Sequence, residues 1–256
     1  MTGRIISLWR HPVKGFTPER LTSAALTAGG FFPCDRIYAV EDGPSGFDPT
    51  RPAWVAKQKF TVLAKIPEVA RARTAYDEAT GVLTARAEGR TTFAASLTDD
   101  AGRDAFAQWL TDFLGEEAKG PLKVVRAPGH RFTDHPRGYV SIVNLASVRD
   151  LEAKSGRSLD PLRFRANLYV DGWQAWIENQ AGPARVRLGA VEAEVFSPIV
   201  RCAATHVDPT TGERNFDLVP ALHEHYGHLN CGVYVSVTEG GSIAEGDTAE
   251  IVPGAV

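Results

Sequence analysis

Alternating apolar and polar positions recur along most of the chain and predict a protein built mainly from β-strands. Residues 191–196 show the pattern clearly, because Val191, Ala193 and Val195 are separated by glutamates. A period of two turns one face of a strand toward a core and the other toward solvent. By the same criterion, further strands are expected over the ranges 3–9, 21–27, 36–41, 54–65, 68–76, 82–88, 122–126, 163–170 and 229–237.

Two stretches have a helical period instead. The first begins after Asp99, a good helix cap, and its apolar residues recur every three or four positions, which gives one apolar stripe. The stripe consists of Phe106, Trp109, Leu110, Phe113 and Leu114. The second begins after Asn144 and stops at Gly156. The predicted fold class is therefore mainly β with a few helices (α+β), and Gly120 and Pro121 are the expected division between two halves.

Composition narrows the class of protein. The chain has 256 residues, of which 43% are hydrophobic and 23% charged, as is usual for a globular protein. A net charge of -3 argues against a general nucleic-acid binder. No apolar run is long enough to span a bilayer, and the N-terminal segment is too short and charged for a secretory signal. Three cysteines without a Cys-x-x-Cys spacing suit a reducing compartment. We therefore expect a cytoplasmic protein with neither nucleic acid nor membrane as partner.

Cys202 is the strongest candidate for chemistry. It follows a predicted strand and precedes a turn favoured by Pro209 and Gly212, so its backbone is held from both sides. Positive charge on Arg201, and on His206 when protonated, favours the thiolate. A thiolate is a candidate nucleophile, redox group or ligand to a soft metal. The alternative is a small buried side chain, because free cysteine is commonly buried.

The sequence around Cys202 resembles the signature of the MOSC family, which is named for the C-terminal domain of molybdenum cofactor sulfurase. The matching run is Arg201-Cys202-x-x-Thr-x-Val-Asp-Pro-x-Thr-Gly212. Within the family, the likeness is strongest to the mitochondrial amidoxime reducing component and its bacterial relatives. The resemblance implies a β-rich MOSC N-terminal domain over 1–118 and a barrel-like MOSC domain over 119–256. It also implies that Cys202 is the catalytic residue and the protein ligand to molybdenum in molybdenum cofactor (molybdopterin).

Shorter motifs extend the resemblance. Lys14 and Gly15 match the family's Pro-Val-Lys-Ser, with glycine in place of serine, and Arg36 matches its Asp-Arg motif. Arg165 and Asn167 match Arg-Phe-Arg-Pro-Asn, and a strand there puts both on one face. Arginine suits phosphate, and asparagine offers a heterocycle both a donor and an acceptor. The implied cofactor-binding residues are Lys14, Gly15, Arg36, Thr133, Asp134, Asn144, Arg165, Asn167, Val200, Arg201 and Cys202.

The activity implied by the resemblance is that of a molybdenum-cofactor-dependent oxidoreductase that reduces N-hydroxylated and other N-oxygenated small molecules. The sequence has no Gly-x-Gly-x-x-Gly motif after a strand and no cysteine cluster suited to iron–sulfur binding. Electrons are therefore expected from a separate donor protein, either ferredoxin-like or of the cytochrome or flavoprotein kind.

Two alternatives stay open at this point. The first is a non-catalytic carrier that stores or delivers molybdenum cofactor, or a sulfur atom bound to Cys202. The second is a zinc hydrolase that uses His223, His225 and His228. The zinc reading is the weaker one, because residues two apart lie on opposite sides of a helix and the His-x-x-x-His spacing is absent.

Overall fold

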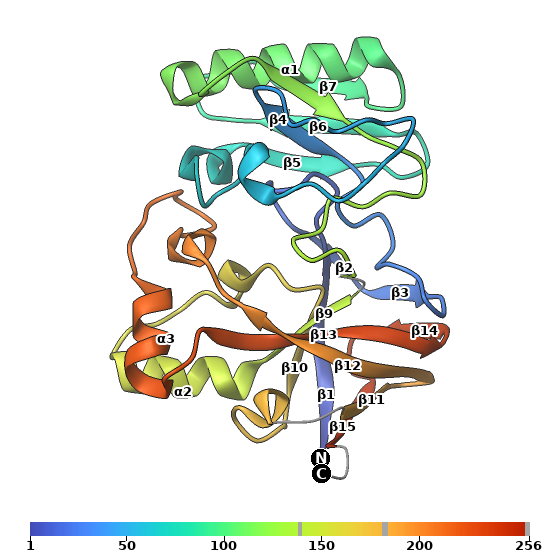
Figure 1. Ribbon diagram of the computed structural model, residues 1–256, viewed down its shortest axis with the longest axis vertical. Coiled ribbons are helices and arrows are strands. Elements are labelled where there is room, and N and C mark those ends of the chain that lie inside the picture. Colours follow the sequence, from blue (N-terminus) through green and yellow to red (C-terminus); the bar gives the residue numbers. More distant parts are fainter. Residues whose placement is uncertain (138–139, 181–183, 254–256) are drawn as a thin grey trace.

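The computed structural model describes residues 1–137, 140–180 and 184–253, arranged as two lobes stacked along the long axis (Figure 1). The strands are β1 (Thr2–Arg10), β2 (Glu19–Leu21), β3 (Ser23–Leu26), β4 (Ala39–Asp42), β5 (Arg73–Tyr76), β6 (Val82–Arg86), β7 (Phe93–Ser96), β8 (Leu122–Val125), β9 (Val140–Asn144), β10 (Leu168–Asp171), β11 (Ala184–Leu188), β12 (Val191–Val200), β13 (Asn230–Glu239), β14 (Gly241–Ala244) and β15 (Thr248–Pro253). The α-helices are α1 (Asp100–Leu114), α2 (Leu145–Ser155) and α3 (Leu218–Tyr226). The 3₁₀ helices are η1 (Lys57–Lys59), η2 (Pro67–Arg71), η3 (Gly115–Glu117), η4 (Pro161–Phe164), η5 (Ile177–Asn179) and η6 (Ala203–His206).

These bounds confirm the predicted class, mainly β with a few helices. Within the described ranges, no helix has both the length and the apolar content that crossing a membrane requires.

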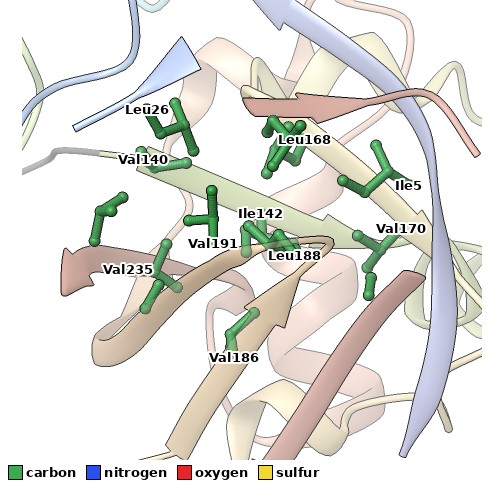
Figure 2. Close-up of a cluster of buried hydrophobic side chains, with 14 of the residues drawn as sticks. Ile5, Leu26, Val140, Ile142, Leu168, Val170, Val186, Leu188, Val191 and Val235 are labelled. Carbon is green, nitrogen blue, oxygen red and sulfur yellow. The ribbon is translucent and has the colours of Figure 1, made fainter. Parts of the chain in front are cut away.

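The lower lobe in Figure 1 is a closed β-barrel. Its strands follow the order β10-β9-β13-β12-β11-β15-β1, and a further pairing between β1 and β10 closes the ring. Side chains at alternate strand positions point inward, so the interior fills with aliphatic residues. Ile5, Ile142, Leu168, Val186 and Val235 belong to this core (Figure 2). The expected barrel-like domain is confirmed.

The upper lobe consists of two small sheets and α1. One sheet pairs β4 with β8, and the other has the order β5-β6-β7. Asp99 caps α1 as predicted, because its side chain accepts a 2.8 Å hydrogen bond from the backbone nitrogen of Gly102. Phe106 and Leu110 of the apolar stripe are fully buried in the core of this lobe.

Each lobe contains strands from both sides of the expected boundary after residue 118. β1 and β2 belong to the barrel sheet, and β3 pairs with β14, although all three precede the upper lobe in the chain. β8 lies beyond residue 118 and yet pairs with β4 of the upper lobe. The segments that follow β1 and β8 therefore pass between the lobes, where the candidate site lies.

The strands predicted over 54–65 and 68–76 are largely wrong. Of these residues only β5 forms a strand, and the remainder contains η1, turns and η2. The apolar residues of this segment are buried in two different cores, so their pattern does not come from one face of a strand. Phe60 packs in a small cluster with Phe132, whereas Leu63 joins the core of the upper lobe.

The strands begin later than predicted at both arginine motifs. β4 and β10 each start three residues after the motif arginine, Arg36 or Arg165. Arg36 has φ 50° and Arg165 has φ 53°, values in the left-handed region that a strand does not use. The prediction that Arg165 and Asn167 share one face of a strand is therefore wrong, and tight turns orient the two arginines instead.

Candidate functional site

A cavity of about 240 Å³ lies between the lobes, and both lobes line it. The upper lobe contributes Lys57 and the segment 62–64, while the barrel lobe contributes Ser141 and Tyr234. The wall includes all but one of the residues that the MOSC resemblance implies. Those present are Lys14, Gly15, Arg36, Thr133, Asp134, Arg165, Asn167, Val200, Arg201 and Cys202.

Cys202 lies between the end of β12 and the start of η6, close to the strand end as predicted. Its main-chain carbonyl accepts hydrogen bonds from the backbone nitrogen (2.9 Å) and the hydroxyl (2.8 Å) of Thr205. The side chain is half-buried and lines the cavity. The sulfur is therefore held on an ordered turn that faces the space between the lobes.

Arg201 and His206 do not assist this sulfur in the way the sequence suggests. The guanidinium of Arg201 donates to the main-chain carbonyls of Cys231 (2.7 Å from Nε) and Phe164 (2.7 Å from Nη1). The His206 ring accepts a hydrogen bond from the backbone nitrogen of Val219, 3.3 Å away, on the other side of the turn. Arg201 thus fixes the backbone around the site instead of pairing with the thiolate.

A cation near Cys202 that sequence reasoning missed is Lys57. Lys57 lies on η1 in the upper lobe and lines the same cavity as Cys202 of the barrel lobe. Its Nζ is also 3.8 Å from Oδ2 of Asp134. Burial opposes the charge on Lys57, but Asp134 and Cys202 outweigh burial and raise the pKa of Lys57. No sequence signal identified it, because the surrounding residues were taken for a strand.

Lys14 and Asp134 form an ion pair on the same wall. Lys14 is 3% exposed, and its Nζ also donates a 2.9 Å hydrogen bond to the carbonyl of Phe132. Burial lowers the pKa of Lys14, and Asp134 offsets part of that effect. Burial disfavours ionised Asp134, yet Lys14 and Lys57 hold the pKa of this carboxyl well below its usual range. Asp134 is therefore a carboxylate between two lysines at neutral pH.

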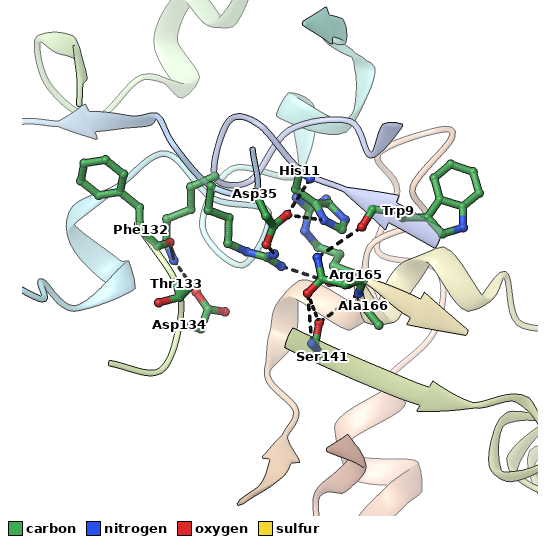
Figure 3. A network of polar contacts seen from close by, with 12 residues as sticks. Trp9, His11, Asp35, Phe132, Thr133, Asp134, Ser141, Arg165 and Ala166 are labelled. Carbon is green, nitrogen blue, oxygen red and sulfur yellow. Dashed lines mark hydrogen bonds and ion pairs between the residues drawn. The ribbon is translucent and has the colours of Figure 1, made fainter. Parts of the chain in front are cut away.

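Arg36 and Arg165 bring two half-buried guanidinium groups to the cavity. Asp35 pairs with Nη1 of Arg36 and also accepts a 2.7 Å hydrogen bond from the backbone nitrogen of His11 (Figure 3). Burial opposes the charge of Arg36, but Asp35 outweighs it and raises the pKa of Arg36. Burial and the nearby Arg36 lower the pKa of Arg165 to about 10. Both groups are cations at neutral pH, and Asp35 compensates only the first directly.

Asn167 lines the cavity, but most of its hydrogen-bonding capacity is used within the protein. Its Oδ1 accepts from the backbone nitrogen (3.0 Å) and the hydroxyl (2.9 Å) of Ser141, and its Nδ2 donates to the carbonyl of Trp9 at 3.2 Å. A side-chain amide has two donor hydrogens and two acceptor lone pairs. Asn167 therefore ties β1, β9 and β10 together and retains a single N–H for a ligand.

Asn144 is the one implied cofactor residue that lies elsewhere. It is fully buried and caps α2 by accepting a 3.1 Å hydrogen bond from the backbone nitrogen of Ala146. Its Nδ2 donates to Glu178 (3.0 Å) and to the carbonyl of Gln174 (2.8 Å). The predicted cofactor contact of Asn144 is corrected to a structural role, because a helix cap that faces a buried carboxylate has no donor left for the cavity.

Gly15 replaces the serine of the family motif for a reason that the backbone explains. Its φ is 91°, in the region that favours glycine, and a Cβ there would lie 2.7 Å from the carbonyl oxygen of Thr61. The close approach packs the loop after β1 against the segment that carries Lys57. Glycine at this position therefore brings two walls of the cavity together.

An aromatic group at the cavity was also missed. Tyr234 lines the cavity from β13, with its ring 6.0 Å from that of Phe196 and 5.8 Å from that of His135. The neighbouring Val233 is buried inside the barrel. Alternation along the predicted strand 229–237 was the signal that could have placed Tyr234 on the outer, cavity-facing side.

The histidine cluster gives no support to a zinc centre. In the portion of the chain that the structure describes, no group of three or more His, Cys, Asp or Glu side chains converges as a metal site would require. His228 instead accepts a 3.2 Å hydrogen bond from the backbone nitrogen of Asn230 and stacks on Tyr226.

Comparison with known proteins gives matches over nearly the whole chain. Residues 2–117 match the MOSC N-terminal beta barrel domain, and residues 129–250 match the MOSC domain. The molybdenum cofactor sulfurase of Drosophila yakuba is 30% identical over 124 residues, which cover 45% of this chain and 16% of that protein. The corresponding protein of Caenorhabditis briggsae is 32% identical over 114 residues, covering 42% of this chain and 16% of its own length. The match thus spans about a sixth of these curated relatives.

Solved structures give weaker likenesses. The YuaD protein from Bacillus subtilis has a TM-score of 0.46 at 12% identity, with 100% of this chain and 98% of that chain covered. YiiM from Geobacillus stearothermophilus has a TM-score of 0.36 at 18% identity, with coverages of 45% and 54%. The assignment rests on the two domain matches, which follow one another along the sequence: the chain belongs to the MOSC family.

Proposed function

We propose that the chain binds molybdenum cofactor between its lobes, with Cys202 as the ligand to molybdenum, and uses it to reduce N-hydroxylated or other N-oxygenated small molecules. The observation that carries the proposal is unbalanced positive charge beside a cysteine. The cations that line the cavity are Lys14, Arg36, Lys57, Arg163, Arg165 and Arg201, and the carboxylates that pair with them among the described residues are Asp35, Asp134 and Asp208. Positive charge is therefore in excess, and a phosphate monoester, with two negative charges, would offset most of it.

The donor set of the cavity fits such a group. Arg163 lines the cavity, and its buried Nε has no hydrogen-bond partner among the described residues. Buried donors are normally satisfied, so a ligand acceptor is a reasonable partner for it. The sulfur of Cys202 is a soft ligand of the kind that a thiophilic metal prefers. Phosphate-binding groups and a soft ligand together suit a phosphorylated heterocycle that carries such a metal.

The bound group would supply a metal that takes up and releases electron pairs. The chain's own residues bind and orient it, with the arginines at the anionic end and Cys202 at the other. Reduction of an N-hydroxylated compound consumes an electron pair and a pair of protons and releases water. We propose that a separate redox protein supplies the electrons. Lys57 lines the cavity near Cys202, and its ammonium group would donate a charge-assisted hydrogen bond to the substrate oxygen.

The relatives named molybdenum cofactor sulfurase support a second candidate. In this alternative the chain is a carrier that holds molybdenum cofactor, or a sulfur atom on Cys202, and passes it on. The same cavity and the same cysteine would serve both roles, so binding alone does not separate them.

Metal and pterin analysis tests the binding. Wild-type protein, Cys202→Ala and the control Cys34→Ala are purified from cells that make molybdenum cofactor. We expect molybdenum and pterin with the wild type and the control, and loss of molybdenum from Cys202→Ala. A wild-type protein without either would refute the proposal. Turnover of an amidoxime with a chemical reductant then supports the reductase, whereas bound cofactor without turnover supports the carrier.

A further inference from the structure

The segment that follows Cys202 leaves the barrel lobe and packs into the upper lobe (Figure 1). We call residues 203–214 the strap. Val207, in its middle, is 1% exposed and belongs to the hydrophobic core of the upper lobe, together with residues such as Leu63 and Ile66. The chain on the C-terminal side of Cys202 is therefore anchored in one lobe, while β12, on its N-terminal side, belongs to the other.

The outer part of the strap is a rigid turn. Oδ1 of Asp208 accepts hydrogen bonds from the backbone nitrogens of Thr210 (2.8 Å) and Thr211 (2.9 Å). The backbone nitrogen of Gly212 donates to the carbonyl of Asp208 at 2.9 Å, and that of Asp208 donates to the carbonyl of Glu213 at 2.8 Å. The turn thus holds its own shape and does not depend on contacts with the upper lobe.

Arg214 connects the strap to the opposite wall of the cavity. Its Nη2 donates to the carbonyls of Ala64 (2.8 Å) and Leu63 (3.4 Å), which both line the cavity. Its Nη1 donates to the carbonyl of Ala203, 3.3 Å away and next to Cys202 in the chain. The guanidinium group of Arg214 therefore connects Ala203, next to Cys202, to the cavity wall at Leu63 and Ala64.

Arg73 makes a second contact farther from the sulfur. Its guanidinium donates to the carbonyls of Pro209 (3.0 Å) and Thr210 (2.6 Å), at the outer turn. Arg73 and Arg214 are both exposed, and both bind only strap or wall carbonyls in the contacts described. The two arginines form a matched pair. Arg214 binds the carbonyl of Ala203, next to Cys202, whereas Arg73 binds strap carbonyls farther along the chain from Cys202.

We propose that Arg214 is a positioning residue for Cys202. Its guanidinium group sets the separation between the sulfur of Cys202 and the wall formed by Leu63 and Ala64. This separation determines the width of the cavity at the sulfur. The inference deepens the proposed function, because it concerns the same cysteine. The effect of Arg214 on catalysis rests on the proposed function. The positioning of Cys202 does not, because the contacts of Arg214 are within the chain.

Alkylation of Cys202 in the metal-free protein tests the inference. The rate of reaction with iodoacetamide is followed by mass spectrometry of the peptide that contains Cys202, in wild type, Arg214→Ala, Arg214→Lys and the control Arg73→Ala. Loss of the fork frees the strap next to the sulfur, so Arg214→Ala is expected to react about three to ten times faster than wild type. Arg73→Ala is expected to stay within about twofold, because the Asp208 turn keeps its shape without Arg73.

Arg214→Lys keeps the charge but cannot bridge the same carbonyls, so its rate is expected to lie between those of wild type and Arg214→Ala. It also serves as the test variant if Arg214→Ala does not fold. Full restoration by lysine, equal acceleration in the Arg73 and Arg214 variants, or no acceleration would each overturn the inference. Molybdenum content of the wild type is measured separately. A protein without molybdenum whose Arg214 variants still react faster would refute the proposed function and leave this inference standing.

Discussion

Nη2 of Arg36 donates a 3.0 Å hydrogen bond to the main-chain carbonyl of Arg165. The two arginines come from distant parts of the chain, and each occupies a left-handed turn. Their half-buried guanidinium groups line the same cavity, where like charges raise the free energy of the ligand-free protein. An anion bound between them would offset that cost, so the pair is a pre-organised anion site.

Substitution of either arginine is expected to weaken anion binding. Arg36→Gln and Arg165→Gln each remove one charged fork and leave the other, so affinity for inorganic pyrophosphate is expected to fall about tenfold or more. Calorimetric titration of the metal-free protein measures this directly. Arg90→Gln, on an exposed turn, is the control and should bind as the wild type does. Equal affinity in all these proteins would show that the pair is not the anion site.

Much of the fold could be predicted from local sequence patterns. The cap and stripe of α1 and the alternation of β12 are consequences of neighbours in sequence, and the structure bears them out. The segment 54–65 failed because its apolar residues alternate between two cores, Phe60 in one and Leu63 in the other. Alternation of apolar and polar residues indicates which positions are buried. It indicates a strand only where all the buried side chains face one core.

The candidate site also has residues that the sequence predicted and residues that it did not. Most residues that the MOSC resemblance implies do line the cavity, because motif residues are tied to the local turns that orient them. Lys57 was missed because it and Cys202 line the cavity from different lobes, a proximity that no local pattern records. Asn144 was misassigned because a capping asparagine and a ligand-binding asparagine look alike until the partners, here Ala146 and Glu178, are known.

His11 is expected to make the protein sensitive to acid. It is 1% exposed and faces Asp35, Arg36 and Arg165. Burial and the two arginines lower the pKa of His11 to about 3. In the unfolded chain His11 takes up a proton as the pH falls below about 6.5, whereas in the folded protein it stays neutral until far lower pH. Stability supplied by neutral His11 is therefore complete above pH 6.5 and declines as the pH falls toward 3.

Urea unfolding of His11→Asn between pH 7 and pH 4 checks this. The free energy of unfolding of the wild type should fall more steeply than that of the variant, with slopes that differ by up to about 1.4 kcal/mol per pH unit. His223→Asn, at an exposed position on α3, should follow the wild type. Parallel pH profiles for wild type and His11→Asn would show that His11 does not contribute.

Cys202 is expected to be the first cysteine that an alkylating reagent modifies. Burial, with a contribution from Glu78, raises the pKa of Cys34 to about 11, and burial raises the pKa of Cys231 to about 12. Both stay as unreactive thiols at pH 8, whereas Cys202 faces the cavity. Peptide mass spectrometry after brief treatment with iodoacetamide should find the label on Cys202, and Cys202→Ser should abolish the fast reaction. Earlier labelling of Cys34 would contradict the assignment.

Gly15→Ser is expected to destabilise the protein, although it restores the serine of the family motif. The φ of 91° disfavours any Cβ, and this Cβ would also lie 2.7 Å from the carbonyl oxygen of Thr61. Together these effects should lower the free energy of unfolding by about 2 kcal/mol or more. Gly43→Ser is the matched control, because Gly43 has φ 81° with nothing within 4 Å of the added Cβ, and it should cost about 1 kcal/mol.

The difference between the two variants in denaturant unfolding isolates the contact with Thr61 from the backbone strain. Because Thr61 follows the segment that carries Lys57, relief of the clash would move that wall away from Lys14. Gly15→Ser should therefore also weaken pyrophosphate binding in the metal-free protein, which Gly43→Ser should leave unchanged. Equal stability losses with unchanged binding would mean that serine fits here as it does in the relatives, and that the close approach at Gly15 does not shape the site.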